Sequence, residues 1–455
     1  MRDLILVVFI LVSLGASLRY PFVGVLIWAW FTIMTPHQMA YETFGIPLNL
    51  IIAAITIVSI FASREAERFR LDTITCLLLF FLAWQTIAQH MSLMPENSAE
   101  YYSRFVKTLI FVLVCIQMTT TRLRFHALTW ILAGGIAFFA VKGALFTLAT
   151  LGQYRVQGLP DTILEDNNHF GIAAATVLPM IIYMRGQVAN RHLRMAMLGV
   201  VLLTLLAIIG THSRGALVAM VAFGGYLWLK SSYKVSLALA GAAALIPAIM
   251  FMPSKWLERM GSISEAGQDA SFMGRIDAWI INWSLAKDNP FTGVGLRNSY
   301  LDEIAIQSVS IEQAAHAKAA HSIYFEILGG SGFVGLAIFL SMFAFAFLKA
   351  RAIETSKNPN VAYWHRDFAR YAKMSLFIFA IGGASTSMEM WDGYLVIIAL
   401  IAALDRTIQS ATSRKGYARK KSNGLRYRPR SQWSYPDIEG NAGLDISRKP
   451  APKTP

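Results

Sequence analysis

The chain has 455 residues, of which 55% are hydrophobic and 15% charged, and its mean hydropathy is +0.47. This combination excludes an ordinary soluble protein of this length and indicates a protein embedded in lipid. The formal net charge is +14, and residues 406–455 contribute +9 of it through twelve Lys and Arg against three Asp and Glu. Beside a membrane, such a tail is typical of a disordered cytoplasmic segment that contacts anionic lipid, rather than of a nucleic-acid site.

Apolar segments long enough to cross a bilayer recur along the chain. A hydrocarbon core of about 30 Å needs roughly 20 helical residues, and somewhat fewer where flanking side chains reach the interface. The sequence therefore predicts an all-α polytopic protein with about 12 (12–13) transmembrane helices, in a membrane domain over residues 1–405 that precedes the tail at 406–455. In chain order, the segments are 4–18, 20–34, 47–62, 73–89, 105–119, 127–150, 170–184, 195–211, 214–229, 235–252, 321–348, 374–387 and 393–405.

Lys and Arg gather in alternate short loops, and this bias predicts the orientation because such loops stay in the cytoplasm. The basic loops lie near 64–70, 122–124, 185–194, 230–234 and 349–373. The other loops are expected to face away from the cytoplasm, namely 35–46, 90–104, 152–169, 211–214 and 253–320. The longest, 253–320, has six Lys/Arg and eight Asp/Glu, opposite in sign to the tail. The side of the N-terminus stays open, because Arg2 favours the inside and the span count favours the outside.

Ionisable residues gather at three places on the predicted outward face. A charge at the rim of a bilayer is costly to keep there, so each place is a candidate functional site. Singly, each has a structural explanation, since Arg214 could anchor to headgroups, and Gly293 with Gly295 could form a simple turn. Together, two guanidiniums and an imidazole suit a diphosphate, because Arg binds phosphate oxygens in pairs and His accepts a proton near neutral pH. The three places are Thr211–Gly215, Gly274–Asn298 and His321–Gly335.

At these residues the sequence resembles the O-antigen ligase and O-antigen polymerase superfamily of bacterial membrane glycosyltransferases. The resemblance covers a core of about residues 195–345. It rests on Ser-Arg-Gly at 213–215, on Gly-Arg, Trp, Asn-Pro and Gly-x-Gly through 274–295, and on His-Ser-x-Tyr-x-Glu with two following glycines at 321–335. The N-terminal half, 1–190, is similar to the exosortase A-associated O-glycosylation ligases, through the Trp-Ala-Trp, Met-Thr-Pro-His and Glu-Asp-Asn-Asn-His-Phe-Gly runs that start at Trp28, Met34 and Glu165.

The resemblance implies an enzyme that transfers a glycan from undecaprenyl diphosphate to an acceptor hydroxyl, as in protein O-glycosylation. The site would lie on the periplasmic face of the bacterial inner membrane, under a cap formed by residues 253–320, with the C-terminus in the cytoplasm. The expected partners are the lipid-linked glycan and an acceptor protein or glycan, and no nucleic acid. The resemblance also implies that no cofactor or metal ion takes part, and the absence of an Asp-x-Asp motif and a Gly-rich nucleotide loop from the sequence does not contradict this.

The resemblance also implies roles for individual residues. His321 would be the catalytic base, and Arg214 and Arg275 would hold the diphosphate. Arg297 could contact phosphate or only the membrane surface. The identity of the base is open to a degree, because His316 and Lys318 closely precede His321. Further contacts to the glycan or acceptor are expected from Arg155, Asp166, Asn168, His169 and Tyr324.

Three other functions fit parts of the sequence. A polymerase of the same superfamily would join one lipid-linked repeat to another by the same chemistry. An intramembrane serine protease could use Ser331 in Gly329–Gly332, but His321 lies ten residues away, roughly 15 Å along a helix, so small-residue packing explains the motif better. A transporter or flippase could use Lys142 in the 127–150 segment, although its charges should then lie at mid-membrane rather than at the rim.

Overall fold

The computed structural model describes residues 2–39, 45–63, 70–236, 238–239, 241 and 270–408, all within one compact unit, Met1–Ser410. Throughout these ranges the regular elements are helices, and no strand occurs. Three predicted features lie largely outside the described residues. They are the span at 235–252, the first part of the long loop at 253–269, and the basic tail from residue 409 onward.

The first helices follow the apolar segments of the sequence closely, because each begins and ends where charged, proline or glycine residues flank an apolar run. They are α1 (Arg2–Arg19), α2 (Pro21–Met34), the 3-10 helix η1 (Pro36–Met39), α3 (Leu48–Ala62), α4 (Thr73–His90), α5 (Pro95–Met118), α6 (Arg122–Ala149), α7 (Asn167–Gln187), α8 (Arg191–Gly210) and α9 (Arg214–Lys230). Side-chain caps fix several starts, as where Asp72 accepts the Thr75 N–H at 2.7 Å.

The second half of the chain departs more from the prediction. Its elements are α12 (Ala270–Asp288), the 3-10 helix η4 (Asn298–Tyr300), α13 (Asp302–Ala305), α14 (Ile311–Ala314), α15 (Ile323–Glu354), α16 (Tyr363–Gly383) and a last helix at 392–408. The described part of the predicted loop 253–320 is therefore largely helical. The predicted span 374–387 was misplaced: α16 starts at Tyr363, and residues 384–391 form an irregular buried segment.

Five of the described helices are long and apolar enough to cross a membrane, namely α4, α5, α6, α8 and α15. Three shorter apolar helices, α1, α2 and α3, precede them. The fold is that of an all-α, polytopic membrane protein, and the count of about 12 spans stays a prediction.

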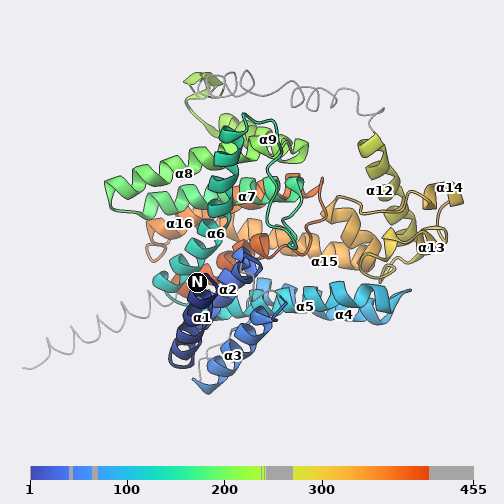
Figure 1. Ribbon diagram of the computed structural model, residues 1–455, viewed down its shortest axis with the longest axis horizontal. Coiled ribbons are helices and arrows are strands. Elements are labelled where there is room, and N and C mark those ends of the chain that lie inside the picture. Colours follow the sequence, from blue (N-terminus) through green and yellow to red (C-terminus); the bar gives the residue numbers. More distant parts are fainter. Residues whose placement is uncertain are drawn as a thin grey trace, which may run out of the picture. The chain divides into compact units, whose positions relative to one another are not determined.

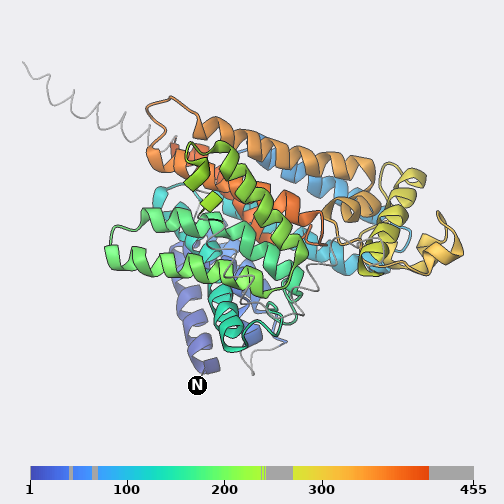
Figure 2. The ribbon, with the colours of Figure 1, turned by 90° about the horizontal axis from the view of Figure 1, so that it is seen from above.

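Helix α15 lies among α4, α12 and α16, and α7 packs against α6, α8, α9 and α16. Figure 1 shows α12, α13 and α14 gathered where α15 begins and α4 ends, and Figure 2 shows the same grouping from above. Long-range backbone hydrogen bonds agree, because the Leu93 N–H after α4 donates to the Val294 carbonyl at 3.1 Å. We refer to this part of the molecule, where α4 ends and α5, α7, α9 and α15 begin, as the loop end.

A break in α15 ties the segment after α12 to the helix bundle. Gly332 has φ 69° and ψ −175°, outside the helical region, and an added Cβ there would lie 2.2 Å from the Phe291 carbonyl oxygen. The helix groups freed by the break bond to this segment: the Phe333 N–H donates to Pro290, and the Val294 N–H donates to Gly329, both at 2.9 Å. The two glycines at 293 and 295 adopt positive φ against this break, which gives them a structural role.

The break also explains the motif that resembles a serine protease. The Ser331 hydroxyl is buried and donates to Gln85 Oε1 at 2.9 Å, and an added Cβ at Gly335 would lie 2.4 Å from the Ser331 Cβ. The serine therefore joins α15 to α4. Its surroundings support the packing explanation over a nucleophile.

Candidate functional site

Four of the segments predicted to face outward meet at the loop end. Asn97 Nδ2 donates to Asn298 Oδ1 at 2.8 Å, which joins the start of α5 to the segment after α12. Asn167 Nδ2 donates to the Thr211 carbonyl at 2.7 Å, which joins the start of α7 to the turn before α9. These contacts join residues 201 and 44 positions apart in the chain, and all four segments were predicted to face outward from the charge pattern.

The peptide that precedes His321 is held from several sides. Trp279 Nε1 donates to the Ala320 carbonyl at 2.7 Å, and the Ala320 N–H donates to Glu326 Oε1 at 2.8 Å. The indole of Trp279 is stacked on Phe325, with ring centroids 5.2 Å apart. These contacts draw on α12, α15 and the turn between them, so the backbone at His321 is fixed by side chains from two helices.

His321 itself has a strained backbone, with φ 46°. Its N–H donates to Ser387 Oγ at 3.1 Å, and the Ser387 hydroxyl donates to Glu326. A non-glycine residue keeps a positive φ only where its surroundings over-determine it, and such residues concentrate at functional sites. The local structure thus fixes where the imidazole of His321 is presented.

The electrostatic surroundings of His321 keep its imidazole neutral. Burial, the Arg275 guanidinium and His169 lower its pKa from the ordinary 6.5 to about 4, with a smaller contribution from Lys318, while Asp166 opposes the shift. The ring therefore carries a free lone pair at pH 7 and can accept a proton. Four residues predicted to form the site, His321, Arg275, His169 and Asp166, are close enough to act on one another.

Arg297 forms a second charged group close to the first. It is half-buried, its guanidinium lies over the Tyr101 ring at 4.4 Å, and its backbone has φ 60°. Burial opposes its charge, but Glu389, Tyr300 and Glu326 outweigh burial and raise its pKa further above its ordinary value. Arg297 is thus a permanent cation beside two buried carboxylates, which argues against the alternative of an anchor on the membrane surface.

His169 lies within reach of both His321 and Arg297, since its charge acts on His321 and is itself influenced by Arg297 and Glu389. We refer to these residues together as the charged group: His321, Arg275, His169, Asp166, Arg297, Glu326 and Glu389. Its Nδ1 is 2.7 Å from the Ile163 carbonyl, which can only accept, so Nδ1 carries the proton and Nε2 the lone pair. Within the described part of the chain, that buried Nε2 has no hydrogen-bond partner. The neighbouring Asp166 and Asn168 form the helix start, where Asp166 Oδ1 accepts the Asn168 N–H at 2.8 Å.

Arg214, another predicted ligand of the diphosphate, lies at the start of α9. Arg214 follows Ser213, whose Oγ caps α9 by accepting the Ala216 N–H at 3.2 Å. An added Cβ at Gly215 would lie 2.0 Å from Ser385 Oγ, so the start of α9 packs against the 384–391 segment that holds His321. The position of Arg214 therefore suits the predicted site, and its bond to a diphosphate stays a prediction.

The structure does not bring Arg155 and Tyr324 into the charged group. Arg155 is exposed and lines a separate hollow of about 270 Å³ together with Lys142. The Tyr324 hydroxyl donates to the Ala380 carbonyl at 2.6 Å, which ties α15 to α16. His316, a possible alternative base, is exposed with Nδ1 3.4 Å from Asp277 Oδ2, so its carboxylate partner lies outside the His321 group.

Two residues of the group were not predicted as site residues. Glu326 stands in the quoted motif but received no role, and Glu389 lies in the segment between α16 and the last helix. Glu389 Oε2 is buried and, among the described residues, lacks a hydrogen-bond partner. The available signal was an acidic residue in a short turn between apolar segments on the predicted outward face.

Comparisons with known proteins divide the chain into two parts. Residues 198–340 match the family model described as O-Antigen ligase, a range that contains Arg214, Arg275, Arg297 and His321. Residues 1–189 match a family of unknown function (DUF5935), a range that contains His169. No curated protein matches the chain significantly. Residues 198–340 are therefore similar to the O-antigen ligase family, which supports a relationship to that superfamily over this part of the chain.

Proposed function

We propose that the protein transfers a glycan from undecaprenyl diphosphate to an acceptor hydroxyl, in the manner of protein O-glycosylation. The observation that carries the proposal is the neutral imidazole of His321 beside the guanidinium of Arg275, with a second guanidinium, from Arg297, within reach of the neighbouring His169. A neutral base and permanent cations are the groups that a displacement with a diphosphate leaving group requires. The O-antigen ligase match supports the glycan-transferring role.

In the proposed reaction, the acceptor oxygen attacks the anomeric carbon of the glycan. The bond from that carbon to the acceptor oxygen forms while the bond to the diphosphate oxygen breaks, with inversion expected. The acceptor proton passes to His321, and undecaprenyl diphosphate leaves as an anion. Arg275 stabilises the charge that develops on the leaving oxygen, with Arg214 and Arg297 as further ligands. The reaction needs no nucleotide sugar and no metal ion.

We place this reaction on the periplasmic face of the bacterial inner membrane, with the C-terminus in the cytoplasm. The test is cysteine labelling by a membrane-impermeant maleimide in spheroplasts, in a variant whose exposed native Cys76 is replaced by serine. A cysteine at Ile311, which is 76% exposed, should react, whereas one at Tyr363, which is 75% exposed, should react only after lysis. The reverse pattern would overturn the assignment.

The enzymatic test uses the purified protein in nanodiscs with lipid-linked glycan, with and without a candidate acceptor protein. Glycosylated acceptor and released undecaprenyl diphosphate support the proposal. Lengthened lipid-linked chains, formed whether or not the acceptor is present, would identify a polymerase of the same superfamily instead. Full activity in EDTA is expected, and a requirement for an added metal ion would contradict the proposed mechanism.

A further inference from the structure

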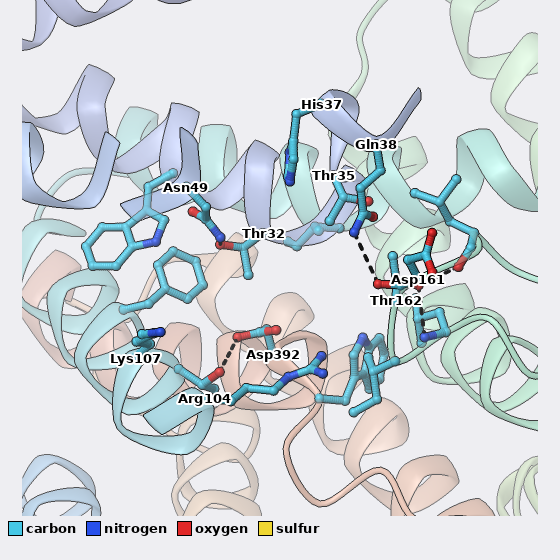
Figure 3. A pocket seen from close by; sticks show the side chains of 18 of the residues that line it. Thr32, Thr35, His37, Gln38, Asn49, Arg104, Lys107, Asp161, Thr162 and Asp392 are labelled. Atoms are coloured by element: carbon cyan, nitrogen blue, oxygen red, sulfur yellow. Dashed lines mark hydrogen bonds between the residues drawn. The ribbon is translucent and has the colours of Figure 1, made fainter. Parts of the chain in front are cut away.

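A cavity of about 330 Å³ is lined mainly by residues 28–170 of the N-terminal half, with Trp391 and Asp392 from the C-terminal part of the chain. Its walls come from α2 and η1, from the start of α3, from α5, from the 159–164 segment and from the start of the last helix. Figure 3 shows Thr32, Asn49 and Gln38 on one wall, opposite Arg104, Lys107 and Asp392. Its volume is in the usual range for small-molecule sites.

The polar atoms of this cavity are incompletely satisfied. Gln38 Nε2 donates to the Asp161 carbonyl at 3.1 Å, and Asn49 Nδ2 donates to Thr32 Oγ1 at 3.4 Å, so each amide uses its nitrogen. Gln38 Oε1, Asn49 Oδ1 and Thr35 Oγ1 are buried, and the described residues provide them with no partner. Buried oxygen atoms without a partner are uncommon and call for an occupant that donates hydrogen bonds.

The apolar part of the cavity is aromatic. Trp28 and Phe111 lie with ring centroids 5.2 Å apart, and Phe139, Phe170 and Trp391 also line the cavity, together with the aliphatic residues Ile33, Leu159, Ile163 and Leu164. Flat aromatic faces beside amide oxygens suit a molecule with both C–H faces and hydroxyl groups. A sugar ring has this combination, whereas a polyprenyl chain would leave the amide oxygens unsatisfied.

The charges of the cavity balance. Arg104 and Lys107 are matched by Asp161 and Asp392; the charge of Arg104 acts on Asp392, which also accepts the Thr108 hydroxyl at 2.9 Å. A diphosphate would require cations in excess of the carboxylates that line the cavity. A balanced set of donors and acceptors instead suits a neutral molecule with many hydroxyl groups.

The cavity and the charged group lie along the same face of α5. Tyr101, under Arg297, is three residues before Arg104 and seven before Thr108, and such spacing places all three on the same side of a helix. At 1.5 Å rise per residue, the cavity-lining residues of α5, from Arg104 to Phe111, lie about 5 to 15 Å along the helix axis from Tyr101. The same adjacency holds on α7, where Phe170 lines the cavity and His169 joins the charged group.

We propose that this cavity binds the sugar units of the lipid-linked glycan, with hydroxyl groups donating to Asn49 and Gln38 and a ring face against the aromatic wall. The inference rests on the proposed function, because it makes the cavity the glycan subsite of the same transferase. It assigns a recognition role to the N-terminal half of the chain, whose family has no assigned function.

The test replaces Asn49 by leucine, which keeps the side-chain shape and removes the amide. Asn49→Leu should raise the KM for lipid-linked glycan about three- to tenfold with kcat nearly unchanged, the effect of losing a neutral hydrogen bond. Asn49→Gln should recover part of the loss. The matched control is Gln153→Leu, which changes an exposed amide in the 150–166 loop outside the cavity lining and should leave both constants unchanged.

Binding without turnover separates this proposal from the proposed function. Glycan released from the lipid by mild acid should give saturation-transfer NMR signals with the wild type and with His321→Ala, and weaker ones with Asn49→Leu. Unchanged glycan binding and KM in a folded Asn49→Leu protein would overturn the glycan subsite and leave the transferase standing. Glycan binding that depends on Asn49 in a protein without transferase activity would support the subsite and refute the reaction.

Discussion

The two ends of the helix bundle treat their charged residues differently. We call the basic end the part where α5 and α15 finish and α4 and α16 begin. There, Lys349 Nζ lies 2.7 Å from Asp405 and 3.4 Å from Asp72. Arg406 donates to the Gln117 carbonyl at 3.1 Å. Charges at this end are paired with carboxylates or with carbonyl groups that helix ends leave free.

At the loop end, buried polar atoms lack such partners. Arg297 Nε, Glu389 Oε2 and His169 Nε2 are all buried, and across the described ranges none has a hydrogen bond. Leaving one such group unsatisfied costs about 1–3 kcal/mol. The contrast fits a division of roles. Charges at the basic end stabilise the fold and its orientation in the membrane, whereas the unpartnered groups at the loop end would find their partners in the proposed substrate.

The largest effect should follow from removing the proposed base. His321→Ala should lower the turnover number for glycan transfer about 1000-fold, the contribution of a well-placed general base, without changing the melting temperature appreciably. His316→Ala is the matched control, because this exposed histidine faces Asp277 rather than the charged group. Turnover measured with saturating lipid-linked glycan decides the point, and near-normal transfer by His321→Ala would remove His321 from the mechanism.

The next largest effect should come from the guanidinium beside His321. Arg275→Ala should lower kcat/KM about 100- to 1000-fold, because it removes a cation that stabilises charge developing on the leaving diphosphate. The control is Arg155→Ala, an exposed arginine outside the charged group, which should stay within about twofold of the wild type. Equal losses in the two variants would indicate that positive charge on this face acts only through long-range attraction.

The positions of many helices were predictable because they depend on local sequence patterns, namely apolar runs and the residues that flank them. The helices α1, α2, α3 and α4 coincide with apolar runs between charged or turn-forming residues, and hydropathy alone locates them, whereas α5 starts at Pro95, ten residues before its predicted span 105–119. The start of α16 was not predictable in this way. Its first half is amphipathic, and Lys373 there pairs with Glu354 of α15, a contact that only the folded chain creates.

The residues of the candidate site likewise divide into those that local motifs predict and those that only the folded chain brings together. Arg275 and His321 stand in motifs of recognisable spacing, and the charge pattern placed their segments on one face. Glu389 has no motif around it, and its importance arises from its proximity to Arg297, almost a hundred residues earlier. The break at Gly332 was likewise not predictable from the sequence. A glycine in an apolar helix is compatible with a straight span, and the break arises from hydrogen bonds with the segment at 290–294.

A smaller effect, on stability alone, is expected at the basic end. Lys349→Ala should lower the free energy of unfolding by about 1 kcal/mol or less, because its partners Asp72 and Asp405 are partly exposed and remain solvated. The transfer rate should not change. Thermal unfolding in nanodiscs at low and high salt measures the loss, which should shrink as salt screens the pair; a drop in kcat at this end would contradict the division of roles between the two ends.

The smallest effect concerns pH and depends on the neutrality of His321. With a pKa of about 4, His321 stays unprotonated as the pH falls from 7 to 5, so the acid limb of kcat/KM should lie near 4 rather than at the ordinary 6.5. Because the unfolded chain takes up a proton at 6.5 and the folded chain only near 4, the contribution of His321 to stability falls as the pH drops through that window.

One charge change should move this limb in a known direction. Lys318 helps to lower the pKa of His321, so Lys318→Gln should raise that pKa and shift the acid limb of kcat/KM toward neutral pH by a fraction of a unit. Lys287→Gln removes an exposed lysine of α12 that is not among the groups acting on His321, and it should leave the limb in place. If His321→Gln and the wild type have the same acid limb, another group must limit the reaction at low pH. His169 would then be the next residue to replace, because its Nε2 carries a lone pair and can accept a proton.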